Sequence, residues 1–173
     1  MNYEDFIGVI KDFPKEGISF KDISPLLRNG PAFHQCIADL VALAKPYHPD
    51  VILAPEARGF VFASAMAAEM GIGFVMARKK GKLPGKNIQV NYALEYGNDV
   101  LEVREDSFKD GDRVLLVDDL IATGGSFEAL KELVVKAKGT PVAALAVIRL
   151  QELEGEKRIG LPVKWLIDLS AKR

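Results

Sequence analysis

Hydrophobic residues along this chain follow two spacings, one typical of buried strands and one typical of amphipathic helices. Short, mostly apolar runs predict strands at 51–54, 73–78, 114–117, 142–148 and 163–167. Apolar residues three or four positions apart predict helices at 33–44, 59–70 and 127–137. Strands that alternate with helices indicate an α/β fold, with a mostly parallel central sheet covered by helices on both faces.

Two parts of the chain depart from this alternation. Apolar positions within residues 6–10 predict a short amphipathic helix near the N-terminus. Residues 88–94 and 100–103 predict an antiparallel pair of strands around a turn at Gly97-Asn98. The polar, glycine-bearing segment 79–87 before them predicts a loop.

Composition narrows the class of protein. No repeat or Ser/Gly-rich linker divides the 173 residues, so we expect residues 1–173 to form a single domain. With 49% hydrophobic and 27% charged residues, the chain has the balance of an ordinary globular protein. The formal net charge of −1 argues against a nucleic-acid-binding protein. Cys36 has no partner cysteine for a disulfide or a zinc site, and His34 and His48 are too far apart for an HExxH-type metal centre.

The sequence predicts no membrane attachment. Glu4 and Asp5 stand where a signal peptide would carry Lys or Arg. The longest apolar stretch, residues 59–77, is interrupted by Glu69, and we interpret it as a buried helix followed by a buried strand. We therefore expect a cytoplasmic protein.

The most informative motif is VLLVDDLIATGGS, residues 114–126. A buried strand leads to the adjacent carboxylates of Asp118 and Asp119, and an Ala-Thr-Gly-Gly-Ser turn then opens a helix. Ligands of open α/β sheets bind at the carboxyl ends of strands, and amide groups at a helix N-terminus suit a phosphate. A plain helix cap would explain the turn but not the two carboxylates. The motif therefore predicts a sugar-phosphate site, with the carboxylates accepting hydrogen bonds from ribose hydroxyls.

This motif is neither a Walker A loop, because no Lys follows the glycines, nor a dinucleotide fingerprint, because the chain has no GxGxxG. It resembles the 5-phosphoribosyl 1-diphosphate (PRPP) motif of the type I phosphoribosyltransferases. Four more segments, residues 12–27, 55–60, 78–85 and 92–97, resemble the N-terminal signature, pyrophosphate loop, mobile basic loop and loop-closing segment of the adenine phosphoribosyltransferase family. The resemblance implies a Rossmann-like type I phosphoribosyltransferase core that transfers 5-phosphoribosyl from PRPP to N9 of adenine, giving AMP and pyrophosphate.

The resemblance also implies roles for individual residues. For PRPP and AMP binding it implies Asp118, Asp119, Ala122, Thr123, Gly124, Gly125 and Ser126. For adenine it implies backbone groups around Ile18 and Ser19, with Lys21 behind them, and the faces of Phe20 and Leu120. For pyrophosphate it implies Arg58, Arg78, Lys79 and Lys82. The implied catalytic residues are Glu95 as general acid/base, Asp118, Asp119 and Arg58.

Further expectations follow from the same resemblance. Residues 1–30 would form an N-terminal helix and a base-binding hood, and residues 79–97 a flexible β-hairpin loop that closes over the site. Mg²⁺ would be held mainly by substrate oxygens, because the sequence offers no dedicated protein cage. The partners would be adenine, PRPP and a second copy of the chain in a homodimer, without nucleic acid or membrane.

Several of these residues have ordinary structural explanations. Phe20 can be a core aromatic, Glu95 a solvated carboxylate at a strand end and Arg58 a solvated residue at a helix start. Arg149 stands where many relatives carry an acid, which puts any role of that acid in doubt. Two other functions stay open at this point, namely a PRPP-sensing regulator and a phosphoribosyltransferase for xanthine, hypoxanthine or guanine.

Overall fold

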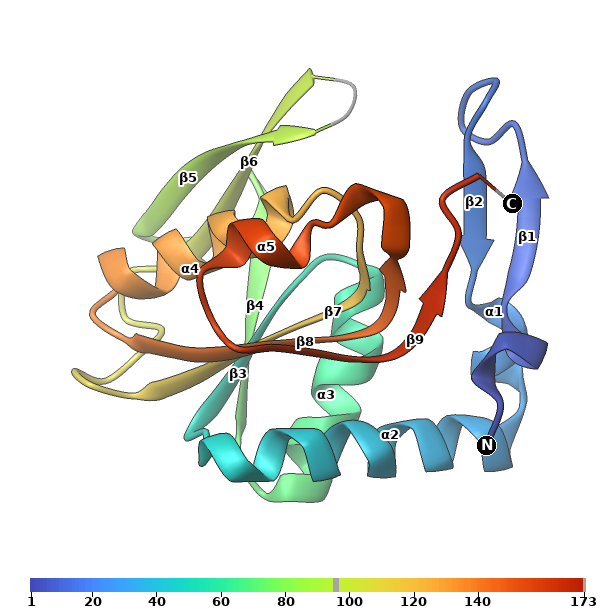
Figure 1. Ribbon diagram of the computed structural model, residues 1–173. Helices are drawn as coiled ribbons and strands as arrows, with labels where there is room; N and C mark the ends of the chain where they lie inside the picture. Colours follow the sequence, from blue (N-terminus) through green and yellow to red (C-terminus); the bar gives the residue numbers. More distant parts are fainter. Residues whose placement is uncertain (95–96, 173) are drawn as a thin grey trace.

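A computed structural model describes residues 1–94 and 97–172. Within these residues a seven-stranded sheet has the order β5-β6-β4-β3-β7-β8-β9 (Figure 1). Its strands are β3 (Val51–Pro55), β4 (Gly73–Lys79), β5 (Asn87–Leu94), β6 (Gly97–Arg104), β7 (Arg113–Ile121), β8 (Thr140–Leu150) and β9 (Val163–Leu169). Strands β4, β3, β7, β8 and β9 pair in parallel, whereas β5 and β6 form an antiparallel hairpin joined to the edge of β4. The predicted mostly parallel sheet is confirmed.

Helices cover both faces of the sheet. They are α2 (Gly30–Ala44) and α3 (Arg58–Met70) on one face, with α4 (Gly125–Lys136) and the short α5 (Glu156–Ile159) on the other (Figure 1). Asn29 caps α2, because its side chain accepts a hydrogen bond from the backbone N–H of Ala32. The three helices predicted from periodicity are all present.

Strand β3 shows why the sequences of the central strands are unbroken runs of apolar residues. All five of its residues are buried. Ile52 and Ala54 belong to the core under α2 and α3, and Val51 and Leu53 to the core under α4. A strand with a helix layer on each face needs apolar side chains at every position.

The N-terminal segment differs from the prediction. Only Tyr3–Phe6 is helical, as a short 3₁₀ helix, and it is followed by the antiparallel hairpin β1 (Gly8–Lys11) and β2 (Ser19–Asp22). The helix predicted within residues 6–10 is therefore wrong. Val9 and Ile10 are β-branched, and Ile10 pairs with Phe20 across the hairpin. The hairpin stands beside β9, and α1 (Ser24–Arg28) joins it to α2 (Figure 1).

Two other boundaries also differ. The turn predicted at Gly97-Asn98 is wrong, because both residues lie in β6, with Gly97 opposite Leu94 and Asn98 opposite Ala93. Strand β7 continues to Ile121, four residues beyond the apolar run. Residues 59–77 form most of α3 and all but the end of β4, as interpreted. In the part of the chain that the structure describes, no helix is long and apolar enough to cross a membrane.

Candidate active site

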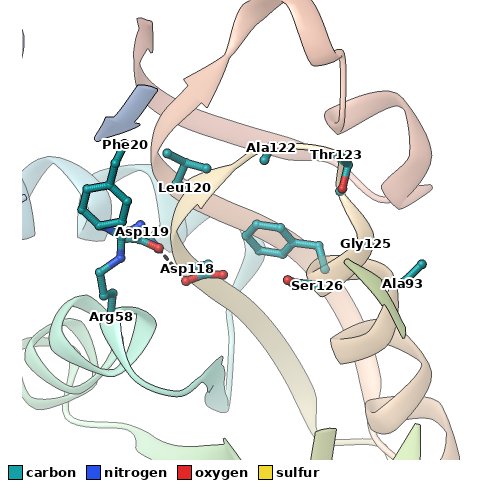
Figure 2. A pocket seen from close by; sticks show the side chains of 12 residues that line it. Phe20, Arg58, Ala93, Asp118, Asp119, Leu120, Ala122, Thr123, Gly125 and Ser126 are labelled. Carbon is teal, nitrogen blue, oxygen red and sulfur yellow. Dashed lines mark hydrogen bonds and ion pairs between the residues drawn. The ribbon is translucent and has the colours of Figure 1, made fainter. Parts of the chain in front are cut away.

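A cavity of about 450 Å³ opens where the carboxyl end of β7 meets the start of α4 (Figure 2). It is lined by Phe20, Arg58, Ala93, Asp118, Asp119, Leu120, Ala122, Thr123, Gly124, Gly125, Ser126 and Phe127. These residues come from β2, the start of α3, β5, β7 and α4. The cavity thus unites the predicted sugar-phosphate motif with residues far from it in the sequence.

Arg58 connects three parts of this cavity. Its Nη2 lies 2.8 Å from Oδ2 of Asp119, a carboxylate that is 5% exposed. Its Nη1 donates a hydrogen bond of 2.9 Å to the carbonyl of Lys21, and its guanidinium lies 4.8 Å from the centre of the Phe20 ring. Figure 2 shows Arg58 directed toward Asp119 beneath Phe20. Arg58, which is predicted to bind pyrophosphate, therefore joins the end of β7 to the N-terminal hairpin in this structure.

Asp118 is held differently from its neighbour. Its Oδ1 accepts the backbone N–H of Asp119 at 2.8 Å. Burial, together with the nearby charge of Asp119, raises the pKa of Asp118 well above 3.8, while Arg58 lowers it in part. A Cβ on Gly59 would lie 2.9 Å from Oδ1 of Asp118, so the start of α3 approaches this carboxylate as only glycine allows.

The loop after β7 forms a cradle of backbone groups. Residues 122–126, which we call the phosphate loop, lead directly into α4, which begins at Gly125. Gly124 has a φ of 87°, in the left-handed region that glycine adopts without strain. Thr123 and Ser126 line the cavity. A helix N-terminus reached through such a turn presents unpaired amide groups, and this arrangement suits a phosphate.

The residues predicted to bind a base separate into two groups. Phe20 and Leu120 line the cavity, and Phe13 packs edge-on against Phe20 with ring centres 5.2 Å apart. In contrast, the backbone N–H of Ile18 donates to the carbonyl of Lys15, and the Ile18 carbonyl accepts the N–H of Phe13. Both backbone groups of Ile18 are thus already used within the hairpin turn.

Ser19 and Lys21 also point elsewhere. Lys21 is 3% exposed, and its ammonium group donates to the hydroxyl of Ser19 at 2.9 Å. Burial lowers its pKa from the ordinary value. The Lys21 side chain lines a separate cavity with Asp168 and Ser170 of the C-terminal segment. Its contact with the main site is the hydrogen bond that its backbone carbonyl accepts from Arg58.

The other predicted pyrophosphate ligands lie outside the cavity lining. Glu56 accepts the backbone N–H of Lys79 at 2.6 Å and lies 3.4 Å from Nε of Arg78. The ammonium group of Lys79 is 3.2 Å from Asp99 on β6. Lys82 is exposed in the loop between β4 and β5. Arg78 and Lys79 are therefore paired with protein carboxylates.

Glu95, the predicted general acid/base, and Tyr96 lie outside the described residues.

Sequence reasoning missed several neighbours of the site. Glu56 and Asp99 pair with the basic residues, and Ala93 brings β5 to the cavity. Tyr92 lies close enough to Asp99 and Asp118 that burial and these two carboxylates raise its pKa to about 12. Phe127, the first residue of the helix predicted at 127–137, also lines the cavity. Glu56, Tyr92 and Ala93 lie in the segments 55–60 and 92–97 that carry the family resemblance, so that resemblance was the signal that could have identified them.

The carboxylates do not form a metal cage. Within residues 1–94 and 97–172 no group of three or more His, Cys, Asp or Glu side chains could hold a metal ion. Among the described residues, Asp118 and Asp119 are the carboxylates that line the cavity, and Asp119 is paired with Arg58. This donor set fits Mg²⁺ that is held mainly by substrate oxygens and water.

The chain is similar to known proteins over nearly its whole length. Residues 27–164 match the phosphoribosyl transferase domain model. The adenine phosphoribosyltransferase of Oenococcus oeni is 46% identical over 172 residues, covering 97% of this chain and 98% of the relative. The chain belongs to the adenine phosphoribosyltransferase family. A crystal structure of the adenine phosphoribosyltransferase from Thermoanaerobacter pseudethanolicus has a TM-score of 0.93 and 42% identity, covering 96% of this chain and 97% of that one.

A third relative was solved with ligands. The adenine phosphoribosyltransferase of Saccharomyces cerevisiae, complexed with an imino-altritol bisphosphate and adenine, has a TM-score of 0.89 and 36% identity, covering 95% of this chain and 96% of that one. These likenesses confirm the expected type I phosphoribosyltransferase fold.

Within this adenine phosphoribosyltransferase fold, Arg149 has partners in its own chain. It lies 2.6 Å from Asp168 on β9 and 2.8 Å from Glu156 on α5. Its guanidinium lies 4.4 Å from the centre of the Trp165 ring. The basic residue at this position therefore ties the ends of β8 and β9 to α5.

Proposed function

We propose that the cavity at the end of β7 is the site where the enzyme transfers 5-phosphoribosyl from PRPP to N9 of adenine, releasing AMP and pyrophosphate. The observation that carries the proposal is the juxtaposition of the Asp118–Asp119 pair, the phosphate loop and the ring of Phe20 around one cavity. The yeast relative, complexed with adenine, supports this choice of base.

The sugar phosphate would occupy the side of the cavity nearest α4. Backbone amides of residues 122–126 and the hydroxyls of Thr123 and Ser126 would hold the 5′-phosphate. Asp118 and Asp119 would accept hydrogen bonds from the ribose hydroxyls. The base would stack between Phe20 and Leu120, which line the opposite part of the cavity.

Selection of adenine would depend on the N-terminal hairpin. An exocyclic amine donates hydrogen bonds where the 6-oxo group of hypoxanthine or guanine accepts them, so a carbonyl-lined edge should reject the oxo bases. Each mismatched buried polar group costs about 1–3 kcal/mol. In such an edge of Ile18 and Ser19 backbone groups, with Lys21 behind it, the Ile18 carbonyl could accept from the base through its second lone pair, whereas the Ile18 N–H could donate to the base only by leaving the Lys15 carbonyl.

In the reaction adenine N9 forms a bond to C1′ of the ribose as the bond from C1′ to pyrophosphate breaks, with inversion at C1′. The N9 proton passes to a base, a role we assign to Glu95. Arg58, Arg78, Lys79 and Lys82 would stabilise the departing pyrophosphate. Arg78 and Lys79 would exchange Glu56 and Asp99 for pyrophosphate oxygens when residues 79–97 close over the site and exclude water.

Mg²⁺ would supply charge neutralisation on the pyrophosphate oxygens, with Asp118 and Asp119 contacting it at most through water. We also infer a homodimer and a cytoplasmic location, by analogy with the family to which the chain belongs.

Product analysis tests the proposal. The purified protein is incubated with PRPP, Mg²⁺ and one base at a time, chosen from adenine, hypoxanthine, guanine, xanthine and orotate, and the products are separated by chromatography. We expect AMP and pyrophosphate from adenine alone. Turnover of an oxo base would keep the PRPP site and overturn the base assignment. PRPP binding without any turnover would indicate a regulator instead.

A further inference from the structure

The phosphate loop packs against the backbone of a segment that follows β8. A Cβ on Gly155 would lie 2.2 Å from the carbonyl oxygen of Ala122 and 2.7 Å from the nitrogen of Gly124. In the other direction, a Cβ on Gly124 would lie 2.3 Å from the carbonyl oxygen of Gly155. No real Cβ approaches other atoms so closely, so this contact requires glycine on both sides.

Arg158, one turn after Gly155, bonds to the same loop. Its Nη1 donates to the carbonyl of Thr123 at 3.1 Å. Its Nε and Nη2 donate to the two carboxylate oxygens of Glu128, each at 3.1 Å. The guanidinium therefore joins the phosphate loop to α4, beside which α5 lies (Figure 1).

The position of Glu128 gives this ion pair an electrostatic consequence. Glu128 lies in the first turn of α4, the helix whose N-terminus would face the 5′-phosphate. A carboxylate there is favourable for the helix dipole but repels a bound dianion. The two-point pairing with Arg158 offsets that charge.

The segment after β8 that carries Gly155 and Arg158 is itself fixed to the sheet. Glu156 pairs with Arg149 at 2.8 Å, and Arg149 pairs with Asp168 on β9 at 2.6 Å. The ammonium group of Lys131 on α4 donates to the carbonyl of Ile159 at 3.1 Å. Gly155 and Arg158 are thus presented to the phosphate loop by a segment tied to β8, β9 and α4.

We propose that Gly155 and Arg158, outside the 114–126 motif, are positioning residues that set the affinity of the phosphate loop for the 5′-phosphate of PRPP. Gly155 fixes the loop through backbone contact, and Arg158 orients the Thr123 carbonyl and offsets the charge of Glu128. This inference rests on the proposed function, because it requires the 5′-phosphate to bind in this loop.

The test compares Arg158→Ala, Arg158→Lys, Glu128→Gln and the double variant Arg158→Ala/Glu128→Gln. Arg113→Ala is the matched control, since Arg113 also donates to backbone carbonyls, those of Tyr47 and His48, but at the opposite end of β7. The measurements are kcat, the KM for PRPP and for adenine, the Kd of AMP by calorimetry and the melting temperature.

We expect Arg158→Ala to raise the KM for PRPP and the Kd of AMP about 3- to 10-fold, as for loss of a partly exposed ion pair and one hydrogen bond. The KM for adenine and the values for Arg113→Ala should stay near those of the parent enzyme. Removing the unpaired charge in the double variant should recover part of the loss, and Arg158→Lys should fall between the parent and the alanine variant.

Two results would overturn the inference. One is an Arg158→Ala enzyme whose KM for PRPP and Kd for AMP match those of the parent. The other is an equal change in both KM values that follows the melting temperature, as general destabilisation would produce. Failure of the proposed function would be distinct, because the parent enzyme itself would then form no AMP from adenine. Gly155→Ala serves as a second probe and should weaken AMP binding, and AMP binding equal to that of the parent would overturn the role assigned to Gly155.

Discussion

Replacing Arg58 with alanine should destabilise the protein and change the ionisation of Asp118 at the same time. The substitution removes the ion pair with Asp119, the hydrogen bond to the Lys21 carbonyl and the contact with the Phe20 ring. Asp119 would be left as a nearly buried carboxylate without its counter-ion. The N-terminal hairpin would also lose the hydrogen bond that its Lys21 carbonyl accepts from the start of α3.

The structure gives the size of the effect on stability. Removing one partner of a buried ion pair costs about 3–5 kcal/mol, but the Arg58 side chain is 36% exposed, so water can partly replace it. With the hydrogen bond and the ring contact included, we expect the free energy of unfolding to fall by about 3 kcal/mol. In a domain of this size that lowers the melting temperature by about 6–12 °C.

The same substitution should change the pH dependence of ligand binding. Arg58 lowers the pKa of Asp118 in part, so without Arg58 this pKa, already raised by burial, should rise further. A carboxyl group with a raised pKa in the folded state stabilises the protein most at pH below its ordinary value of 3.8 and loses that contribution as the pH rises through the folded-state pKa. If ionised Asp118 binds the ribose, protonation of Asp118 weakens AMP binding as the pH is lowered. This loss should begin at a higher pH in the variant than in the parent enzyme.

The assay is thermal unfolding at neutral pH together with calorimetric titration of AMP across the acid range. Arg58→Lys keeps a cation but not the two-point geometry, so it should retain much of the acid behaviour and less of the stability. A melting temperature within about 2 °C of the parent, well short of the expected decrease of about 6–12 °C, together with an unchanged acid limit for AMP binding, would refute the reasoning that Arg58 supports a buried carboxylate pair.

Three further variants test the other parts of the site. Asp118→Asn combined with Asp119→Asn should abolish AMP formation while far-ultraviolet circular dichroism still reports a folded protein; near-normal turnover would contradict ribose binding. Glu95→Gln should lower kcat by about 10²–10⁴-fold, and a change confined to KM would demote it to a residue that positions the loop. Gly125→Val should weaken AMP binding measured by calorimetry, because its Cβ would lie 2.9 Å from the Ala93 carbonyl beside the cradle; unchanged binding would count against the phosphate site.

The central sheet could be predicted from the sequence because its pattern is local. Buried parallel strands such as Val51–Pro55 are apolar at every position, and the helices between them repeat their apolar residues with helical spacing. The N-terminal hairpin could not be predicted in this way. Residues 6–10 are too short a segment to separate a helical from a strand spacing, and the pairing of Ile10 with Phe20 decides between them.

For the site, too, the local part could be predicted from the sequence and the long-range contacts could not. Asp118, Asp119 and the phosphate loop are adjacent in the sequence, so the motif alone brings them together. The contacts of Arg58 with Asp119 and of Gly155 with Gly124 join residues that no local pattern connects. They form only because β3, β7 and β8 lie side by side and release their following segments at the same edge of the sheet.

In this arrangement the residues that would bind the 5′-phosphate and the residues that position them follow different strands. The groups that would touch the ribose 5′-phosphate follow a single strand, whereas the groups that hold them follow its two neighbours. Arg58, which would also bind pyrophosphate, comes after β3, and Gly155 and Arg158 come after β8. A change in either neighbour should therefore act on PRPP affinity without altering a residue that touches PRPP in the phosphate loop. For that reason a search for functional variants confined to residues 114–126 would miss the positions through which the fold can tune this loop.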